Sequence, residues 1–122
     1  DGLPLNGPDG LEGPNRTRVG APCVDAPLAS GFLLERLGGA FTLLAIDTVP
    51  PDVAESFGLP LQMVQLTTDQ DDPTGAVKER YLGDAPHAIY LIRPDQHVVA
   101  RWAQASGNDV TNAVAVAIGK EL

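Results

Sequence analysis

Residues 83–102 constrain the fold of this chain most, because they predict a β-hairpin entered through a proline. The chain breaks at Ala85–Pro86, continues as an apolar strand over 89–92, and turns again at Pro94–Asp95. A second strand follows, in which three apolar residues are expected to share one face: Val98, Ala100 and Trp102. A hairpin alone is marginally stable in water, so the rest of the chain must supply further strands and helices to cover it.

Two more strands are predicted upstream of the hairpin. Residues 41–46 form a nearly continuous apolar run, which is typical of a strand buried on both faces. Residues 61–67 form the second strand. From all four strands and the last helix, nine residues are expected in the core: Phe41, Leu43, Leu44, Ile46, Val64, Leu66, Ile89, Leu91 and Val114.

Helices are predicted between and after these strands. Pro50 and Pro51 favour a helix that ends at Gly58, and Asp72 is predicted to cap a second helix with Pro73 at its first position. A last helix, capped by Asn108 or Asp109, carries apolar residues at helical spacing: Val110, Ala113, Val114, Ala117 and Ile118. The order β-α-β-α-β-β-α predicts an α/β, thioredoxin-like fold with a central mixed sheet and helices on both faces.

The N-terminal segment differs in character from the rest. Residues 1–22 are rich in Gly and Pro without periodicity, so residues 1–18 are predicted to be a linker or an arm laid along another surface. Residues 19–122 are predicted to form the thioredoxin-like domain, which lacks redox cysteines. Because the chain begins with Asp1 instead of Met, we expect it to be a piece of a longer protein.

Charge and cysteine usage exclude several classes of function. The formal net charge of −8, with no Lys/Arg cluster, disfavours binding to nucleic acid or to an anionic membrane. No stretch approaches the length of about 18 apolar residues that a transmembrane helix needs. The single cysteine, Cys23, cannot form an internal disulfide, which favours the reducing cytoplasm.

The chemistry of a redox thioredoxin is missing from the sequence. That chemistry requires a thiolate of low pKa in the turn after the first core strand, usually within Cys-x-x-Cys. Here the turn comprises residues 46–52 and contains no sulfur, whereas Cys23 precedes the strand. Cys23 is therefore interpreted as a half-buried spectator, and no catalytic residue is assigned.

Other polar groups do not form a recognisable site either. Asp69, Asp71 and Asp72 lack the spacing of a calcium loop and are interpreted as a solvated loop with a helix cap. His87 and His97 have no partners at metal-ligand spacing. Arg93 and Arg101 offer two cations for binding a carboxylate across the hairpin, but pairing with Asp95 or another surface acid is the simpler interpretation. No metal or cofactor ligand is assigned.

Several segments together resemble one known domain. These are Val19–Pro22, Leu33–Gly38, Phe41–Leu44, Ile92–Asp95 and Val98–Trp102. They are similar to the C-terminal thioredoxin-like domain of FAD-dependent aromatic-ring hydroxylases, the flavoprotein monooxygenases of the phenol hydroxylase and 3-(3-hydroxyphenyl)propionate hydroxylase type. The similarity covers residues 17–119.

The resemblance implies a function for the parent protein. FAD-binding and substrate domains would precede this one, NAD(P)H would reduce the flavin, and the C-terminal domain would serve packing, oligomer contacts or active-site access. Three residues would be structural: Pro86, Asp95 and Trp102. Thioredoxin-like folds place a cis proline before the third strand, so Ala85–Pro86 is predicted to be cis. The family continues Arg-Pro-Asp with Gly; here Gln96 either changes the turn or bears strain on the order of 1 kcal/mol.

Two alternatives remain from the sequence. The segment Val19–Pro22, with Gly31 and Gly38, also resembles the N-terminus of a peroxiredoxin, so a divergent peroxiredoxin or thioredoxin is one alternative. The other is a stand-alone thioredoxin-fold binding module that uses the groove beside Pro86.

Overall fold

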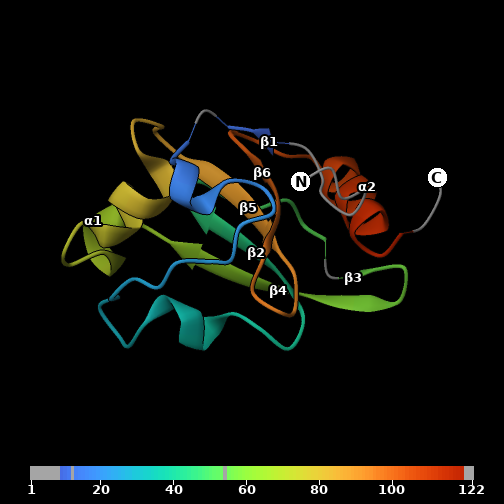
Figure 1. Ribbon diagram of the computed structural model, residues 1–122, viewed down its shortest axis with the longest axis horizontal. Helices are drawn as coiled ribbons and strands as arrows, with labels where there is room; N and C mark the ends of the chain where they lie inside the picture. Colours follow the sequence, from blue (N-terminus) through green and yellow to red (C-terminus); the bar gives the residue numbers. More distant parts are fainter. Residues whose placement is uncertain (1–8, 12, 54, 120–122) are drawn as a thin grey trace.

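The chain folds around one mixed sheet of six strands in the order β1-β6-β5-β2-β4-β3 (Figure 1). The structure is a computed structural model that describes residues 9–11, 13–53 and 55–119. The strands are β1 Asp9–Gly10, β2 Phe41–Ile46, β3 Glu55–Ser56, β4 Leu59–Leu66, β5 Ala88–Ile92 and β6 Val98–Trp102. β2 pairs in parallel with β4 and antiparallel with β5, and β5 pairs antiparallel with β6. The predicted α/β class with a mixed sheet is confirmed, and the arrangement of these four strands is consistent with a thioredoxin-like fold.

Helical segments lie on both sides of the sheet. They are η1 Asn15–Thr17 and η2 Leu33–Arg36, both 3₁₀, then α1 Thr68–Asp71, the π-turn η3 Lys78–Leu82 and α2 Gly107–Ala117. In Figure 1, α1 and α2 lie at opposite sides of the molecule with the sheet between them. None of the described helices is long and apolar enough to cross a membrane.

Two apolar clusters fill the space on the two faces of the sheet. One lies beneath η2 and η3, and the other lies between the sheet and α2. All nine residues predicted for the core are buried, which confirms that set. Alternating positions of β2 divide between the clusters, as expected for a strand covered on both faces.

The predicted helix over residues 50–58 is wrong. The segment instead leads into β3, which pairs with the start of β4 through a two-residue turn. That turn is formed by Phe57 and Gly58, whose φ angles are +52° and +76°. Successive positive φ angles match the twist of a tight hairpin and are incompatible with a right-handed helix. The β2–β4 crossover therefore places no described helix on the α2 face.

The helix predicted after Asp72 is present in altered form. The Asp72 carboxylate accepts hydrogen bonds from the backbone N–H groups of Val77 and Lys78, each at 3.0 Å, so its side chain caps the helix although Asp72 is not the N-cap residue that was predicted. Pro73 is not the first helical residue, because a turn comes between the cap and the helix.

The cap predicted for the last helix is wrong by a few residues. Ser106 is the N-cap of α2, and it exchanges backbone-to-side-chain hydrogen bonds with Asp109.

The prediction that one face of β6 carries Val98, Ala100 and Trp102 is wrong, because the strand contains a β-bulge. Ile92 pairs with Val98 but Leu91 pairs with Ala100, so Val99 is the extra residue. Val98 consequently packs in the cluster beneath η2 and η3, whereas Ala100 and Trp102 pack in the α2 cluster. These three residues do not share one face, because the bulge reverses the alternation between them.

The described part of the N-terminal arm lies along the edge of this sheet. Asp9 and Gly10 pair in parallel with Arg101 and Trp102, so β1 covers the outer edge of β6. Leu11 is buried in the cluster beneath η2 and η3. The described arm therefore lies on the domain itself, while the domain boundary at residue 18 remains a prediction.

Candidate functional site

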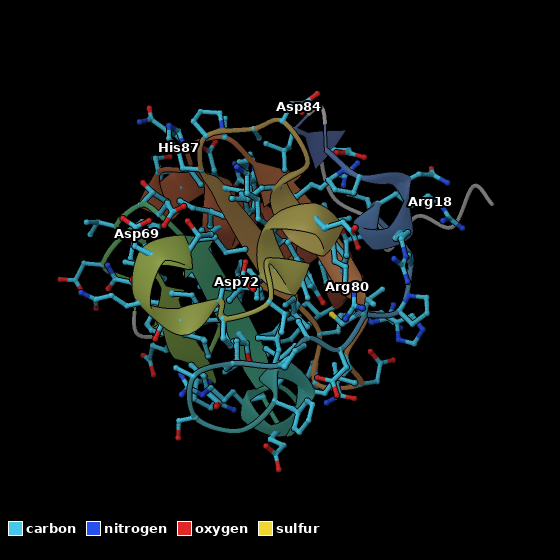
Figure 2. The ribbon with its side chains drawn as sticks, turned by 90° about the vertical axis from the view of Figure 1, so that its left-hand side faces the viewer. Arg18, Asp69, Asp72, Arg80, Asp84 and His87 are labelled. Carbon is cyan, nitrogen blue, oxygen red and sulfur yellow. The ribbon has the colours of Figure 1, made fainter. Side chains whose placement is uncertain are left out.

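An open pocket of about 280 Å³ lies where β2 and β4 end and the chain enters β5. Its lining residues come from these three places and from η3: Asp47, Thr68, Lys78, Leu82, Gly83, Asp84, Ala85 and Pro86. Figure 2 views this side of the molecule, with Asp84 and His87 on the loop before β5 and Asp69 on α1. The pocket therefore includes two places named in the sequence analysis. One is the turn after β2, where a redox thioredoxin would carry its thiolate. The other is Pro86, which was predicted to be structural.

Asp47 is the central polar residue of this pocket. Its carboxylate accepts hydrogen bonds from the Thr68 backbone N–H at 2.8 Å and from Thr68 Oγ1 at 2.7 Å. Its own backbone has a φ of +57°, which is unfavourable for a residue with a side chain. Asp47 thus ties the ends of two parallel strands together, and each of its two carboxylate oxygens accepts one of these bonds. The sequence analysis missed this role, although an Asp directly after a buried strand was a visible signal.

Pro86 lines the pocket, but the prediction of a cis bond at Ala85–Pro86 is wrong, because the bond is trans. The chain reverses earlier, at Gly83, which has a φ of +60° and a ψ of −118°. The Ala85 N–H then donates to the Leu82 carbonyl at 3.0 Å and closes the turn. With the reversal made at a glycine, the chain reaches β5 without a cis proline.

Cys23 does not line this pocket. Its backbone N–H donates to the Gln96 carbonyl at 2.8 Å, and its side chain packs against the cluster beneath η2 and η3. Burial raises the pKa of the Cys23 thiol to about 12, despite a hydrogen bond with Tyr81 that acts in the opposite direction. A thiol with such a pKa is protonated at neutral pH and is a poor nucleophile. This environment argues against the peroxiredoxin alternative.

We expect Cys23 to be alkylated very slowly by iodoacetamide in the folded chain. Since the thiolate is the reactive species, a pKa of about 12 makes reaction at pH 8 roughly 1,000-fold slower than for an exposed cysteine. Mass spectrometry of quenched time points measures this rate, and the same chain in urea is the matched control. The folded chain should also fail to reduce insulin disulfides or to turn over peroxide. Rapid alkylation, or peroxide turnover that Cys23→Ser abolishes, would contradict this assignment.

A buried pair of tyrosines links the arm to the domain. Tyr81 and Tyr90 meet edge to face, with ring centroids 5.2 Å apart. The Tyr90 hydroxyl donates to the Tyr81 carbonyl and lies 3.0 Å from Thr17 Oγ1, which in turn donates to the Arg80 carbonyl at 2.7 Å. Sequence reasoning missed this network, because nothing local relates Thr17 to residues more than sixty positions away.

The hairpin turn holds the predicted structural residue Asp95. Arg93 donates to its carboxylate from Nε at 3.0 Å and from Nη2 at 2.6 Å. These hydrogen bonds hold the Asp95 pKa at about 2. The predicted pairing of Arg93 with Asp95 is confirmed, whereas Arg101 forms its ion pair with Asp9.

The sequence left two alternatives for Gln96, a changed turn or a strained backbone, and the structure shows the strained backbone. Its φ is +67°, in the region that favours glycine. Its Nε2 donates to the carbonyls of Leu34 and Leu37 at 3.0 and 3.1 Å, which satisfies acceptors at the end of η2. These bonds, which a glycine cannot form, offset the strain at this position.

Structural contacts account for three of the remaining candidates: Asp71, His87 and Trp102. His87 Nδ1 lies 2.8 Å from the Ala103 carbonyl, and the Asp71 carboxylate accepts from the Thr67 N–H at 2.8 Å. Trp102 is buried in the α2 cluster. Over the described ranges, no three His, Cys, Asp or Glu side chains form a group that could hold a metal ion.

Known structures share this fold, although no family model and no curated protein matches the chain. Aklavinone-11 hydroxylase, solved with FAD and aklavinone, is 24% identical, with a TM-score of 0.65 over 85% of this chain and 22% of that one. RebC soaked with K252c is 25% identical, with a TM-score of 0.62 over 91% and 21%. The flavin-dependent monooxygenase PieE, solved with FAD and substrate, is 21% identical, with a TM-score of 0.54 over 81% and 19%. The chain thus spans about a fifth of the structures it matches, which include the class that the sequence resemblance indicated.

Proposed function

We propose that this chain is a non-catalytic, C-terminal thioredoxin-like domain of an FAD-dependent aromatic hydroxylase. The observation that carries the proposal is that its fold matches about a fifth of an FAD-bound hydroxylase and of a flavin-dependent monooxygenase. The domain would act in the cytoplasm by packing, by oligomer contacts or by shaping access to the active site of the parent. Its partners would be the FAD-binding and substrate domains.

The chemistry of the pocket supports a role without redox catalysis. At the turn after β2, where a redox thioredoxin needs a thiolate, Asp47 bonds to Thr68. The one cysteine lies elsewhere and has a raised pKa. The pocket therefore presents a carboxylate already engaged in hydrogen bonds, the Lys78 side chain and backbone groups, but no activated nucleophile.

The turn after β2 does not fit FAD. An FAD site uses a glycine-rich turn between a strand and a helix, so that backbone amides can approach the pyrophosphate. The turn after β2 instead runs Asp47-Thr-Val-Pro-Pro51, and both Asp47 and Asp84 line the pocket, where they would repel phosphate. We therefore assign FAD and NAD(P)H to the remainder of the parent protein.

Flavin content tests the proposal directly. The 122-residue chain should purify colourless and should not hydroxylate phenols when FAD and NADPH are supplied. The complete product of the natural gene should be yellow and should oxidise NADPH faster in the presence of an aromatic substrate. Absorbance at 450 nm and NADPH consumption measure the two properties. Stoichiometric FAD on the isolated chain, or a complete gene product without a flavin domain, would contradict the proposal.

A stand-alone binding module is the second candidate, and the pocket beside Pro86 is the observation that favours it. For this candidate, the natural gene product would consist of this domain alone. A ligand would then shift the amide NMR signals of Thr68 and Gly83 but not those of the distant β5–β6 turn. The length of the gene product separates the two candidates before any ligand is known.

A further inference from the structure

The chain itself closes one edge of the sheet and leaves much of the other edge open. β1 pairs with the end of β6, and near the start of β6 the Gly20 N–H donates to the Val98 carbonyl at 2.8 Å, while the Val98 N–H donates to the Ala21 carbonyl at 2.9 Å. At the opposite edge, β3 pairs only with Leu59 and Pro60, the first two residues of β4 (Figure 1). Within the described residues, the remainder of β4 pairs with β2 on its inner side only.

The backbone of β4 points alternately to β2 and to the outer edge. The Leu66 carbonyl accepts a hydrogen bond from the Asp47 N–H at 2.9 Å, so the N–H and C=O groups of Leu66 and Val64 face β2. Those of Met63 and Gln65 face outward, and no described residue bonds to them. We call the backbone N–H and C=O groups of Met63 and Gln65 the open β4 edge.

The open β4 edge lacks the features that keep edge strands apart. Natural edge strands carry charged residues, proline or bulges, or lie beneath another segment, because unpaired backbone groups are a template for pairing with another chain. Residues 61–68 contain no charged residue, no proline and no glycine, and β4 pairs with β2 without a bulge. The side chains along it are exposed at Gln62, Met63 and Gln65. This edge can therefore accept a strand.

We propose that the open β4 edge pairs with the same edge of a second copy of this chain, antiparallel, about a two-fold axis at Val64. In this register Met63 of each copy lies opposite Gln65 of the other, and the two residues exchange both N–H···O=C hydrogen bonds. All the outward groups of the open β4 edge are then bonded in both copies. The proposed function names oligomer contacts without a surface, whereas this inference assigns a strand and a register and does not depend on a flavin-bearing parent.

The length of the open β4 edge favours a second copy over a longer strand. A longer strand would meet β3 at Leu59 and Pro60, or α1 at the other end, where the Thr67 N–H donates to the Asp71 carboxylate. In the two-fold register, β4 of the second copy ends opposite Gln62, because Leu66 is its last residue. Each strand therefore stops before it reaches β3 of the other copy.

Charge opposes the pairing at its two ends. In the same register Pro60 lies opposite Thr68 of the other copy, so Glu55, which pairs with Pro60, lies near α1 of that copy and its Asp69. Lys78 lines the pocket beside Thr68 and is a cation at this end. Because each chain carries a net charge of −8, repulsion dominates, and salt should strengthen the association by screening it.

A cysteine on the proposed axis tests the register. In a Cys23→Ser chain, Val64→Cys places two thiols on opposed residues whose Cα atoms are about 4.5 Å apart, within reach of a disulfide. Met63→Cys is the matched control: this side chain is more exposed, but its two copies are offset by about 7 Å along the strands and exceed that reach. On non-reducing gels, Val64→Cys should form the linked dimer at least 10-fold faster. Equal or faster linking through Met63→Cys, or none through either, would overturn the register.

A second pair of variants tests whether the backbone carries the contact. Gln65→Pro removes an outward N–H without affecting the ladder with β2, whereas Gln65→Ala removes only the side chain. Sedimentation equilibrium should show that Gln65→Pro lowers the association constant at least 10-fold and that Gln65→Ala leaves it within about 2-fold. For the unaltered chain, the constant should rise between about 50 and 500 mM NaCl. A fall with salt, or equal constants for the two variants, would contradict the proposal.

Hydrogen exchange gives a readout that needs no variant. Between about 20 µM and 1 mM chain, the amides of Met63 and Gln65 should exchange at least 10-fold more slowly as dimer forms, while the Val64 amide, bonded to β2, should not change. A chain that stays monomeric over this range, or edge amides already protected at the lower concentration, would overturn the pairing and leave the proposed function intact. A gene product without a flavin domain would overturn the proposed function and leave the pairing intact.

Discussion

Replacing Leu91 by alanine is expected to lower the free energy of unfolding by about 2–5 kcal/mol. Leu91 is fully buried on β5, where it pairs with Leu43 on one side and Ala100 on the other. Its side chain belongs to the cluster between the sheet and α2, so truncation leaves a cavity at the centre of the domain. Because small domains are stable by only about 5–15 kcal/mol, the loss is a large part of the total.

Urea unfolding followed by circular dichroism measures this loss. Met63→Ala is the matched control, because Met63 lies on the same side of the sheet but is partly exposed, and its truncation should cost less than about 1 kcal/mol. A loss below about 0.5 kcal/mol for Leu91→Ala would mean that its burial at the sheet centre is wrongly assigned.

Replacing Arg101 by methionine is expected to lower the free energy of unfolding by about 2–4 kcal/mol and to release the arm. The buried guanidinium donates from Nε to Asp9 Oδ1 at 2.6 Å and from Nη1 to the carbonyls of Pro14 and Thr17 at 2.7 and 3.2 Å. Methionine keeps much of the side-chain volume but removes these donors. The loss in free energy of unfolding should lie at the lower end of the range for breaking a buried ion pair. The reason is that the Asp9 side chain is 39% exposed, so water can solvate it.

Hydrogen exchange of residues 9–18 separates arm release from general unfolding. Asp9→Asn is a graded companion: it keeps an acceptor opposite Arg101 and leaves both carbonyl contacts in place but removes the counter-charge of the buried guanidinium, so its loss should be smaller than that of Arg101→Met. If Arg101→Met unfolds like the wild type and the arm amides remain protected, the guanidinium does not hold the arm.

The errors of the sequence analysis share a physical origin. Pro50, Pro51 and Gly58 are common at helix boundaries, but Phe57 and Gly58 form a turn whose stability comes from pairing β3 with β4. Ala85–Pro86 was predicted to be cis because thioredoxin-like folds place a cis proline before the third strand, whereas here Gly83 already reverses the chain. The bulge at Val99 depends on register with β5, which local alternation does not encode. For the crossover and the bulge, pairing with a neighbouring strand overrode a local preference.

The amino-acid sequence by itself determined the strands β2, β4, β5 and β6, the helix α2 and the absence of sulfur from the turn after β2. Apolar runs and helical spacing encode these elements locally, because burying such runs favours only a few arrangements. Only the tertiary structure decided the path of the crossover, the exposed face of β4 and the position of the arm. The Asp9–Arg101 ion pair joins residues 92 positions apart, and it exists only because the folded sheet brings β1 beside β6. Such contacts form when non-local packing outweighs the chain entropy lost in closing long loops, a balance that local sequence patterns do not reveal.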